Sequence, residues 1–283
     1  MKLARFQSAS GPQIGVVRGD RIIPLADLGI AAADMHEVIA GGDALLARIE
    51  GALATGGDGV PLSDVQLLAP LRPGKFLALG MNYQRHAEEA RKLGIAVPDN
   101  QLWFNKQTTC VSGPYDPIEP GVTEKLDYEV ELGLVIGKAA KSVKAGDAFA
   151  HVFGYIVVND VSARDWQFHS PTMTMGKSFD TFGPIGPWIV TADEIPDSQT
   201  LGLRCLVNGE VRQDSNTRDF IHTIPQQIEY LSTAFTLEPG DIISTGTPEG
   251  VGAAMQPPCF LQPGDVVRCE IDGIGALENR VAG

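Results

Sequence analysis

The chain has 283 residues, of which 43% are hydrophobic and 20% are charged, and its formal net charge at pH 7 is −13. This length can bury a substantial core, in one large domain or in a small domain plus a larger one. Because the charge is strongly negative and no long basic run occurs, nucleic acid and anionic membrane surfaces are poor partners. A site for a small organic acid would have to carry its own cations.

The cysteines and the N-terminus indicate a reducing compartment. Cys110, Cys205, Cys259 and Cys269 form no C-x-x-C pair and no zinc-ligand pattern, so free thiols are expected. The N-terminal residues lack an apolar signal segment, and no stretch approaches the length that spans a membrane. We therefore expect a cytoplasmic protein without a membrane segment.

Residues 1–70 are expected to form a small leading domain of mixed α and β structure. A helix is predicted from about Asp34 to Ala54, with a break at Gly41-Gly42. The proline-punctuated linker from Leu68 to Gly74 then marks the boundary with a larger domain, residues 71–283.

A strand over Phe76–Leu79 leads into a short polar helix. Asn82 is expected to be its N-cap and Gly94 its C-terminal stop. On this helix His86 and Glu89 are three residues apart, so they share a face within reach of a hydrogen bond. Such a pair is often a plain surface contact. A helix with so little apolar surface also fits a mobile lid that carries a general base and its orienting carboxylate.

The stretch from Asp127 to Ile136 alternates apolar and polar residues with the period of a strand, which places Glu129 and Glu131 on the same side. These acids could face solvent on a half-buried strand. The apolar end of the run instead favours a buried strand, where unpaired acids are costly. A second apolar run, Tyr155–Val158, delivers Asp160 at its end. Three carboxylates on two strands predict an oxygen-only site for Mg²⁺ or Mn²⁺.

Arg164 and Lys177 are the cations that a buried organic-acid site would need, although each alone is more often a surface charge. The glycines around Lys177 do not form a P-loop, because the upstream glycine at the required spacing is missing. Gly250-Val251-Gly252 lacks the third glycine of a dinucleotide fingerprint, so NAD binding is not expected.

The last third of the chain alternates turns and strands. Asn208-Gly209 between two apolar runs predicts a hairpin. A helix from Thr223 to about Phe235 is expected to bury Ile228, Leu231 and Phe235. The glycine-rich loop over residues 244–252 follows a strand and can bring backbone N–H groups to an anion.

Several blocks of residues occur in an order that is far more specific than any one block alone. They are Gly80 to Tyr83 with His86 and Glu89, Asp127 to Glu131, Asn159 to Asp165 with Gln167, and Thr245 to Pro248 with Gly250 and Gly252. Lys177 in the sequence Gly-Lys-Ser-Phe-Asp-Thr adds a further match. Together these blocks resemble the fumarylacetoacetate hydrolase superfamily, from about Lys75 to the C-terminus.

The resemblance implies an α+β fold, with a mixed β-roll catalytic domain of the fumarylacetoacetate hydrolase type behind the small N-terminal domain, and usually a homodimer. It implies substrates with a 2-oxo or enol acid group and a divalent cation, Mg²⁺ or Mn²⁺, on Glu129, Glu131 and Asp160. The implied catalytic residues are His86, Glu89 and Lys177. The implied substrate-binding residues are Tyr83, Arg164, Gln167 and Thr247.

The main hypothesis is a metal-dependent hydrolase that cleaves a C–C bond in a 2,4-diketo acid, of the acylpyruvate or diketo-deoxy sugar acid type, to pyruvate and a carboxylic acid. The His86/Glu89 pair favours hydrolysis, because neither decarboxylation nor isomerisation requires an activated water. The alternatives are an oxaloacetate decarboxylase, a 2-hydroxyhepta-2,4-diene-1,7-dioate isomerase and, from another class, a non-catalytic metal-stabilised protein that binds a small acid. The loop over residues 168–175 matches no subfamily, so the sequence does not identify the chemical group at the end of the substrate away from its 2-oxo acid.

Overall fold

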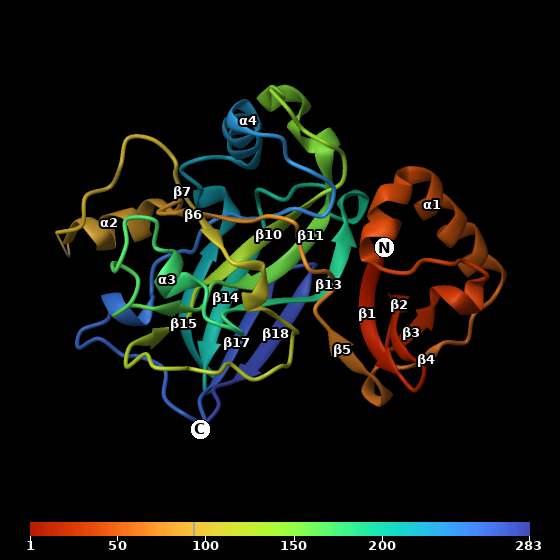
Figure 1. Ribbon diagram of the computed structural model, residues 1–283, viewed down its shortest axis with the longest axis horizontal. Helices are drawn as coiled ribbons and strands as arrows, with labels where there is room; N and C mark the ends of the chain where they lie inside the picture. Colours follow the sequence, from red (N-terminus) through yellow and green to blue (C-terminus); the bar gives the residue numbers. More distant parts are fainter. Residues whose placement is uncertain (93) are drawn as a thin grey trace.

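Strands make up most of the regular structure (Figure 1). The computed structural model describes residues 1–92 and 94–283. Within these residues the strands are β1 (Lys2–Ser8), β2 (Gly11–Arg18), β3 (Arg21–Pro24), β4 (Val60–Pro61), β5 (Gln66–Leu68), β6 (Phe76–Gly80), β7 (Leu102–Lys106), β8 (Val111–Ser112), β9 (Leu126–Asp127), β10 (Val130–Ile136), β11 (Val152–Asn159), β12 (Ser162–Ala163), β13 (Gly183–Thr191), β14 (Gly202–Val207), β15 (Glu210–Asn216), β16 (Ile242–Ser244), β17 (Val266–Ile271) and β18 (Gly275–Arg280). The α-helices are α1 (Met35–Thr55), α2 (Gln84–Lys92), α3 (Thr174–Lys177) and α4 (Ile224–Ala234).

Twelve strands form one mixed sheet, whose main path runs β4-β3-β2-β1-β13-β11-β10-β16-β6-β7, with β5 added on β1 and β8 on β13. The pairs β16 with β6 and β8 with β13 are parallel, and the other described pairs are antiparallel. A four-stranded sheet, β15-β14-β17-β18, packs on the part made by β10, β11 and β13. The α+β fold expected from the sequence is confirmed.

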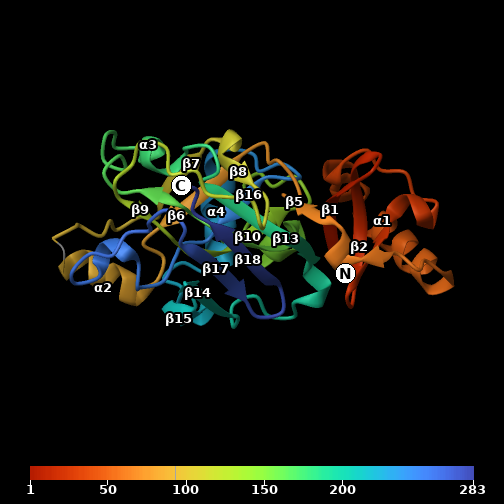
Figure 2. The same cartoon turned by 90° about the horizontal axis from the view of Figure 1, so that it is seen from below.

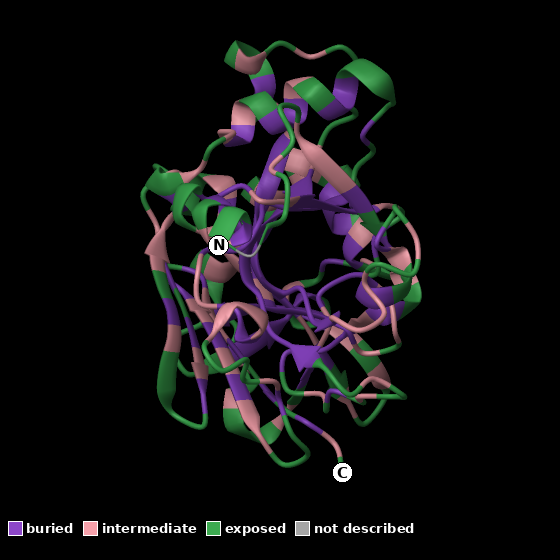
Figure 3. Cartoon of the chain, turned by 90° about the vertical axis from the view of Figure 1, so that its left-hand side faces the viewer, coloured by how far each residue is buried: buried purple, intermediate pink, exposed green. Residues whose placement is uncertain are grey.

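The main hydrophobic core lies between these two sheets. Every residue of β10 and β11 is buried, and Figure 3 shows the buried residues gathered along the strands in the middle of the molecule. Leu132 and Ile156 of the large sheet share one buried cluster with Leu203 and Leu277 of the small sheet. Because β10 and β11 have no solvent-facing side, polar side chains on them need partners inside the protein.

The first segment of the chain occupies one end of the molecule, drawn in red and orange in Figures 1 and 2. Strand β1 pairs with β2 and β5 of this segment and also with β13, where Leu3 faces Ile189. The large sheet is therefore continuous across the expected domain boundary. The division into residues 1–70 and 71–283 stays a proposal.

Helix α1 confirms both features predicted for it. It begins after Asp34, whose carboxylate accepts a hydrogen bond from the N–H of Glu37, and it is kinked at Gly42. Gly42 has φ 52° and ψ −150°, a conformation that favours glycine because it has no Cβ. None of the helices in residues 1–92 and 94–283 combines the length and the apolar composition needed to cross a bilayer.

The Asn208-Gly209 hairpin is confirmed, since both residues have positive φ between β14 and β15. The prediction for Phe235 was wrong. This residue follows the end of α4 and is 37% exposed. The burial of Ile228 and Leu231, predicted for the same helix, is confirmed.

Asn82 does not cap α2, so that prediction was also wrong. The helix begins at Gln84, and the fully buried Asn82 side chain instead joins three segments. Its amide donates to the carbonyls of Thr245 and His222, and its carbonyl oxygen accepts the N–H of His222. The reason is that these buried backbone groups near the start of α2 require partners.

We expect Asn82→Asp to lower the free energy of unfolding by roughly 1–3 kcal/mol or more, because a carboxylate cannot donate to the two carbonyls and would be buried unpaired. The control is Asp34→Asn at the true N-cap of α1, which we expect to stay within about 0.5 kcal/mol because both residues cap well. Urea unfolding measures both. Equal tolerance at the two positions would contradict the cross-linking role of Asn82.

Candidate active site

Three carboxylates meet at the adjacent ends of β10 and β11. Glu131 lies on β10, Glu129 directly precedes it, and Asp160 directly follows β11. The antiparallel pairing of Val130 with Asn159 brings these ends together, and the N–H of Asp160 donates to the carbonyl of Glu129 at 2.9 Å. One carboxylate oxygen from each acid lies within 4.8 Å of the others. Glu129 is 5% exposed, Glu131 1% and Asp160 0%, so the alternative in which these acids face solvent is excluded.

The strand that carries these acids differs from the predicted one. Strand β9 ends at Asp127 and β10 begins at Val130, so Tyr128 and Glu129 belong to neither. The break has a local cause: the Asp127 carboxylate accepts the N–H of Tyr128 and two N–H groups of the loop after β16. The N–H of Glu129 then donates to the side chain of Asn159. Glu129 and Glu131, two positions apart, still reach the same site, as the alternation predicts.

Each acid has its own set of partners. Oε2 of Glu131 accepts hydrogen bonds from the hydroxyl of Ser244 at 2.5 Å and the N–H of Gly246 at 2.9 Å. Glu129 instead contacts cations, with Oε1 at 2.7 Å from Arg164 Nη2 and Oε2 at 2.8 Å from Lys177 Nζ. The same Lys177 Nζ lies 2.8 Å from Oδ2 of Asp160.

These partners separate the acidities of the two glutamates. Burial alone would raise the pKa of Glu129, but Lys177 and Arg164 lower it to about 2. Burial, followed by the charges of Asp160 and Glu129, holds the pKa of Glu131 well above its usual range. The raised pKa means that ionising Glu131 beside two other buried carboxylates is unfavourable. A cation shared by the three acids would stabilise the ionised form.

The residues fit a hard divalent cation. The three acids supply only oxygen atoms, which Mg²⁺ and Mn²⁺ prefer. Ser244 and Gly246 fix one oxygen of Glu131, while its other oxygen, Oε1, receives no hydrogen bond from the described residues. The hydroxyl of Tyr83 is also buried without a partner in residues 1–92 and 94–283, and the charge of Glu131 contributes to the raised pKa of this hydroxyl. Both atoms are available to a ligand.

The predicted pair on α2 is present. His86 Nδ1 lies 3.2 Å from Oε2 of Glu89, and the two side chains are 17% and 26% exposed. The N–H of Gly250 also donates to Glu89, and Arg85 forms an ion pair with Glu249. Helix α2 is thus attached to the loop after β16. The same loop donates to Glu131 through the N–H of Gly246, so it links α2 to the acids. Movement of α2 as a lid stays a prediction.

The proposed substrate-binding side chains lie around the acids, and several of their polar atoms already form hydrogen bonds within the protein. Arg164 Nε pairs with Asp127 at 2.8 Å, and its Nη1 donates to Oε1 of Gln167 at 3.0 Å. The hydroxyl of Thr247 donates to the carbonyl of Val130 and accepts a hydrogen bond from Gln213. Thr247 can therefore offer a substrate only its remaining lone pair or its backbone.

The glycine-rich loop after β16 does bind anions with its N–H groups, and these anions are the protein's own carboxylates. Gly246 donates to Glu131, Gly250 to Glu89, and Gly252 to Asp127. The loop therefore connects a proposed metal ligand, the proposed base pair and the residue that bends the acidic segment.

Two buried residues of the site were not singled out by the sequence. Lys106, at the end of β7, lies 2.5 Å from Oδ1 of Asp160. Gln213 accepts the N–H of Val130 and donates to Thr247 and to the carbonyl of Pro248. No local pattern distinguishes these side chains from exposed ones, because their burial depends on distant segments.

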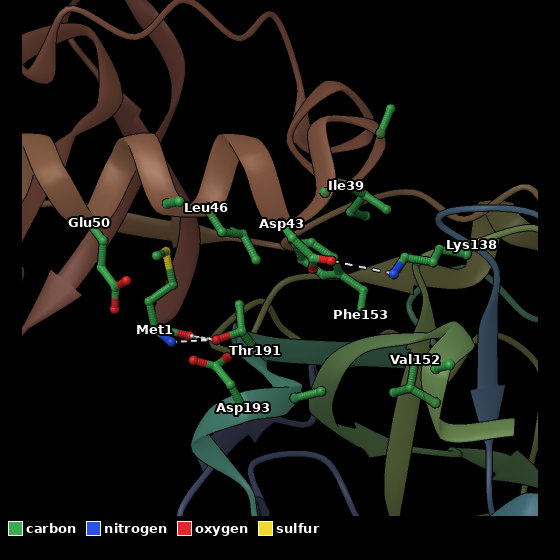
Figure 4. A pocket seen from close by; sticks show the side chains of 16 residues that line it. Met1, Ile39, Asp43, Leu46, Glu50, Lys138, Val152, Phe153, Thr191 and Asp193 are labelled. Atoms are coloured by element: carbon green, nitrogen blue, oxygen red, sulfur yellow. Dashed lines mark hydrogen bonds and ion pairs between the residues drawn. The ribbon is translucent and has the colours of Figure 1, made fainter. Parts of the chain in front are cut away.

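A separate cavity of about 390 Å³ lies between α1 and the segments around β10, β11 and β13 (Figure 4). Its lining includes Leu46 of α1, Phe153 of β11 and Thr191 of β13, and an ion pair between Asp43 and Lys138 borders it. Lys138 follows the end of β10, whereas Glu131 lies near its start. The cavity is therefore distinct from the acidic site.

Comparison with known proteins identifies the family of the chain. The model of the fumarylacetoacetate (FAA) hydrolase C-terminal family matches residues 75–282, and that of the Rv2993c-like N-terminal family matches residues 1–70. The chain belongs to the fumarylacetoacetate hydrolase family. This is a family of enzymes, and the relatives of this chain are named as hydrolases, isomerases and tautomerases.

Three relatives illustrate this range. The mitochondrial oxaloacetate tautomerase FAHD2A of Bos taurus is 43% identical, over 99% of this chain and 91% of its own. Maleylpyruvate hydrolase from Sphingobium sp. SYK-6, in complex with manganese(II) and pyruvate, has a TM-score of 0.83 and 37% identity, covering 100% and 99% of the two chains. A 5-carboxymethyl-2-hydroxymuconate delta-isomerase from Mycobacterium smegmatis has a TM-score of 0.80 and 36% identity, with the same coverage.

We expect Lys177→Met to lower the free energy of unfolding of the EDTA-treated protein by about 3–5 kcal/mol, because two buried carboxylates lose their shared cation. Saturating Mn²⁺ should recover most of this loss, since a divalent cation replaces the ammonium charge. Urea unfolding with and without Mn²⁺ measures both values.

Lys75→Met is the matched control, since Lys75 also bridges two carboxylates, Glu238 and Asp241, but is 28% exposed. We expect a loss of about 1 kcal/mol that Mn²⁺ leaves unchanged. If Mn²⁺ stabilised the Lys177 variant no more than the wild type, Glu129 and Asp160 would not share a metal.

Proposed function

We propose that this protein is a metal-dependent enzyme that moves a proton at C3 of a small 2-oxo dicarboxylic acid, interconverting keto and enol forms as in an oxaloacetate tautomerase. The observation that carries the proposal is the meeting of three buried carboxylates with buried cations in a chain of net charge −13. The nearly full-length similarity to oxaloacetate tautomerases supports this choice over the hydrolysis favoured by sequence alone.

The net charge of the buried acids and their contacting cations, together called the cluster, favours binding of a metal cation first. The metal-loaded cluster then favours binding of an anion. When a bound cation keeps Glu131 ionised, Glu129, Glu131, Asp160 and Asp127 carry four negative charges, and the contacting cations Arg164, Lys177 and Lys106 carry three positive ones. One negative charge is left over, and a divalent cation converts it into one positive charge. A dianionic acid is therefore attracted to the loaded site although the protein as a whole repels it.

A divalent cation on Glu129, Glu131 and Asp160, either Mg²⁺ or Mn²⁺, would supply Lewis-acid polarisation of the 2-oxo group. Arg164 and Gln167 hold a substrate carboxylate, and the Tyr83 hydroxyl or Thr247 accepts or donates a further hydrogen bond. Lys177 stabilises the negative charge that develops on the 2-oxo oxygen as the C3–H bond breaks.

His86 performs the proton transfer in this proposal. Its Nδ1 is engaged by Glu89, so Nε2 is the atom free to take the proton from C3. The same nitrogen returns the proton to the enol oxygen, which completes the tautomerisation. Return of a proton to C3 reverses it.

Hydrolysis of an acylpyruvate is the second candidate, favoured by the same His86/Glu89 pair and by the similarity to maleylpyruvate hydrolase. Here His86 would deprotonate a water that attacks the C4 carbonyl, and the C3–C4 bond would break to give a carboxylic acid and pyruvate. Decarboxylation of oxaloacetate would use the same stabilised enolate. The homodimer and the cytoplasmic location expected from the sequence also remain proposals.

We expect His86→Ala to lower kcat by about 10²–10⁴-fold, the usual contribution of a positioned base, while oxalate binding to the Mn²⁺-loaded protein changes little. His151→Ala is the control, because His151 contacts the carbonyl of Lys138 beyond the far end of β10. Steady-state kinetics and calorimetry measure the two effects. A loss below about fivefold would reduce the His86/Glu89 pair to a surface contact.

The reaction is tested with oxaloacetate and with an acylpyruvate. Under the proposal, protein and Mn²⁺ accelerate the decay of enol-oxaloacetate absorbance, and no labelled acid forms from an acylpyruvate in ¹⁸O-labelled water. The matched control is Glu131→Gln at the same Mn²⁺ concentration, which corrects for tautomerisation by free metal. If the protein released labelled acid from the acylpyruvate, and tautomerised oxaloacetate no faster than the Glu131→Gln control, it would be a hydrolase instead.

A further inference from the structure

Lys106 is a buried lysine that the proposed reaction does not use. It ends β7, at the edge of the large sheet, and is 2% exposed. Its Nζ lies 2.5 Å from Oδ1 of Asp160 and donates to the carbonyl of Lys177, also at 2.5 Å. A third, longer contact at 3.4 Å reaches the carbonyl of Val161. A buried lysine is costly unless it is paired, so these contacts require a reason.

The two carboxylate oxygens of Asp160 have different partners. Lys106 occupies Oδ1, and Oδ2 is the oxygen that contacts Lys177, whose Nζ also contacts Glu129. The hydrogen bond to the Lys177 carbonyl also ties down α3, the short helix that carries Lys177. Lys106 thereby touches both the proposed metal ligand and the backbone of the residue that stabilises the substrate.

The charge of Lys106 decides the sign of the loaded site. With Lys106, the cluster plus a divalent cation has one positive charge; without Lys106 it would be neutral. Unlike Lys177, Lys106 reaches one carboxylate alone and is held by two carbonyls, so it stays in place when a metal binds.

We infer that Lys106 is a positioning residue that fixes Asp160 and adds a permanent positive charge, so that the metal-loaded site prefers dianionic chelating acids. This inference rests on the proposed function and assigns its preference for dianionic acids to one residue, Lys106. A positive charge repels the metal and attracts the acid, so its removal shifts the two affinities in opposite directions. A merely structural role would weaken both.

The experiment measures Mn²⁺ affinity, and then oxalate affinity of the Mn²⁺-loaded protein, by calorimetry. In Lys106→Met we expect Mn²⁺ to bind about tenfold tighter and oxalate about tenfold weaker. Lys106→Gln keeps an N–H donor for Asp160 and carries the same test if the Met variant does not fold. Lys106→Arg keeps the charge, so both affinities should stay within about threefold of wild type.

Lys138→Met is the control for a change in net charge, because Lys138 is 61% exposed beyond the far end of β10. We expect no shift there, since salt screens charges over such distances. Neutral variants that shift both affinities in the same direction, or an Arg variant that loses oxalate, would overturn the inference. Wild-type protein that bound no Mn²⁺ would instead overturn the metal site of the proposed function.

Discussion

The burial of three carboxylates at one junction of two strands is the constraint on which the site depends. Glu129, Glu131 and Asp160 lie where every residue of β10 and β11 is inside the protein. Ionised acids without partners are not tolerated there, so each requires cations, N–H donors or a bound metal. The two sheets bring such groups from segments far apart in the chain, including β7, α3 and the loop after β16.

The groups that compensate the buried acids are also the groups that the proposed chemistry needs. Lys177 and Arg164 neutralise Glu129 and can equally hold the oxygens of a 2-oxo acid. The loop after β16 stabilises Glu131 and at the same time anchors Glu89 beside His86. Folding and function therefore rely on the same contacts, because a site that stabilises clustered negative charge in the protein also stabilises charge that develops on a substrate.

The same arrangement supports several reactions, which is why relatives of similar structure carry different names. The reactions proposed for this chain all need a stabilised enolate, and they differ in which bond at C3 breaks. In this chain the loop over residues 168–175 turns Met173 inward at φ 57°, with its sulfur 3.4 Å from Gln167 Nε2, while Phe168 points outward and is 69% exposed. The Met173 side chain belongs to a small buried cluster with Phe104 and Ala78.

The sequence by itself determined the fold class, the kinked helix α1, the hairpin at Asn208-Gly209 and the three acids, because these depend on local periodicity, on glycine conformation and on blocks of neighbouring residues. Only the tertiary structure decided that Asn82 joins segments, that Asp127 bends the acidic stretch, and that Lys106 and Gln213 belong to the site. Each of those side chains has at least one partner between 34 and 163 positions away, and nothing in its immediate neighbours specifies that partner. A buried lysine and an exposed one read alike in sequence, since burial is a property of the packed sheets and not of the strand that carries the residue.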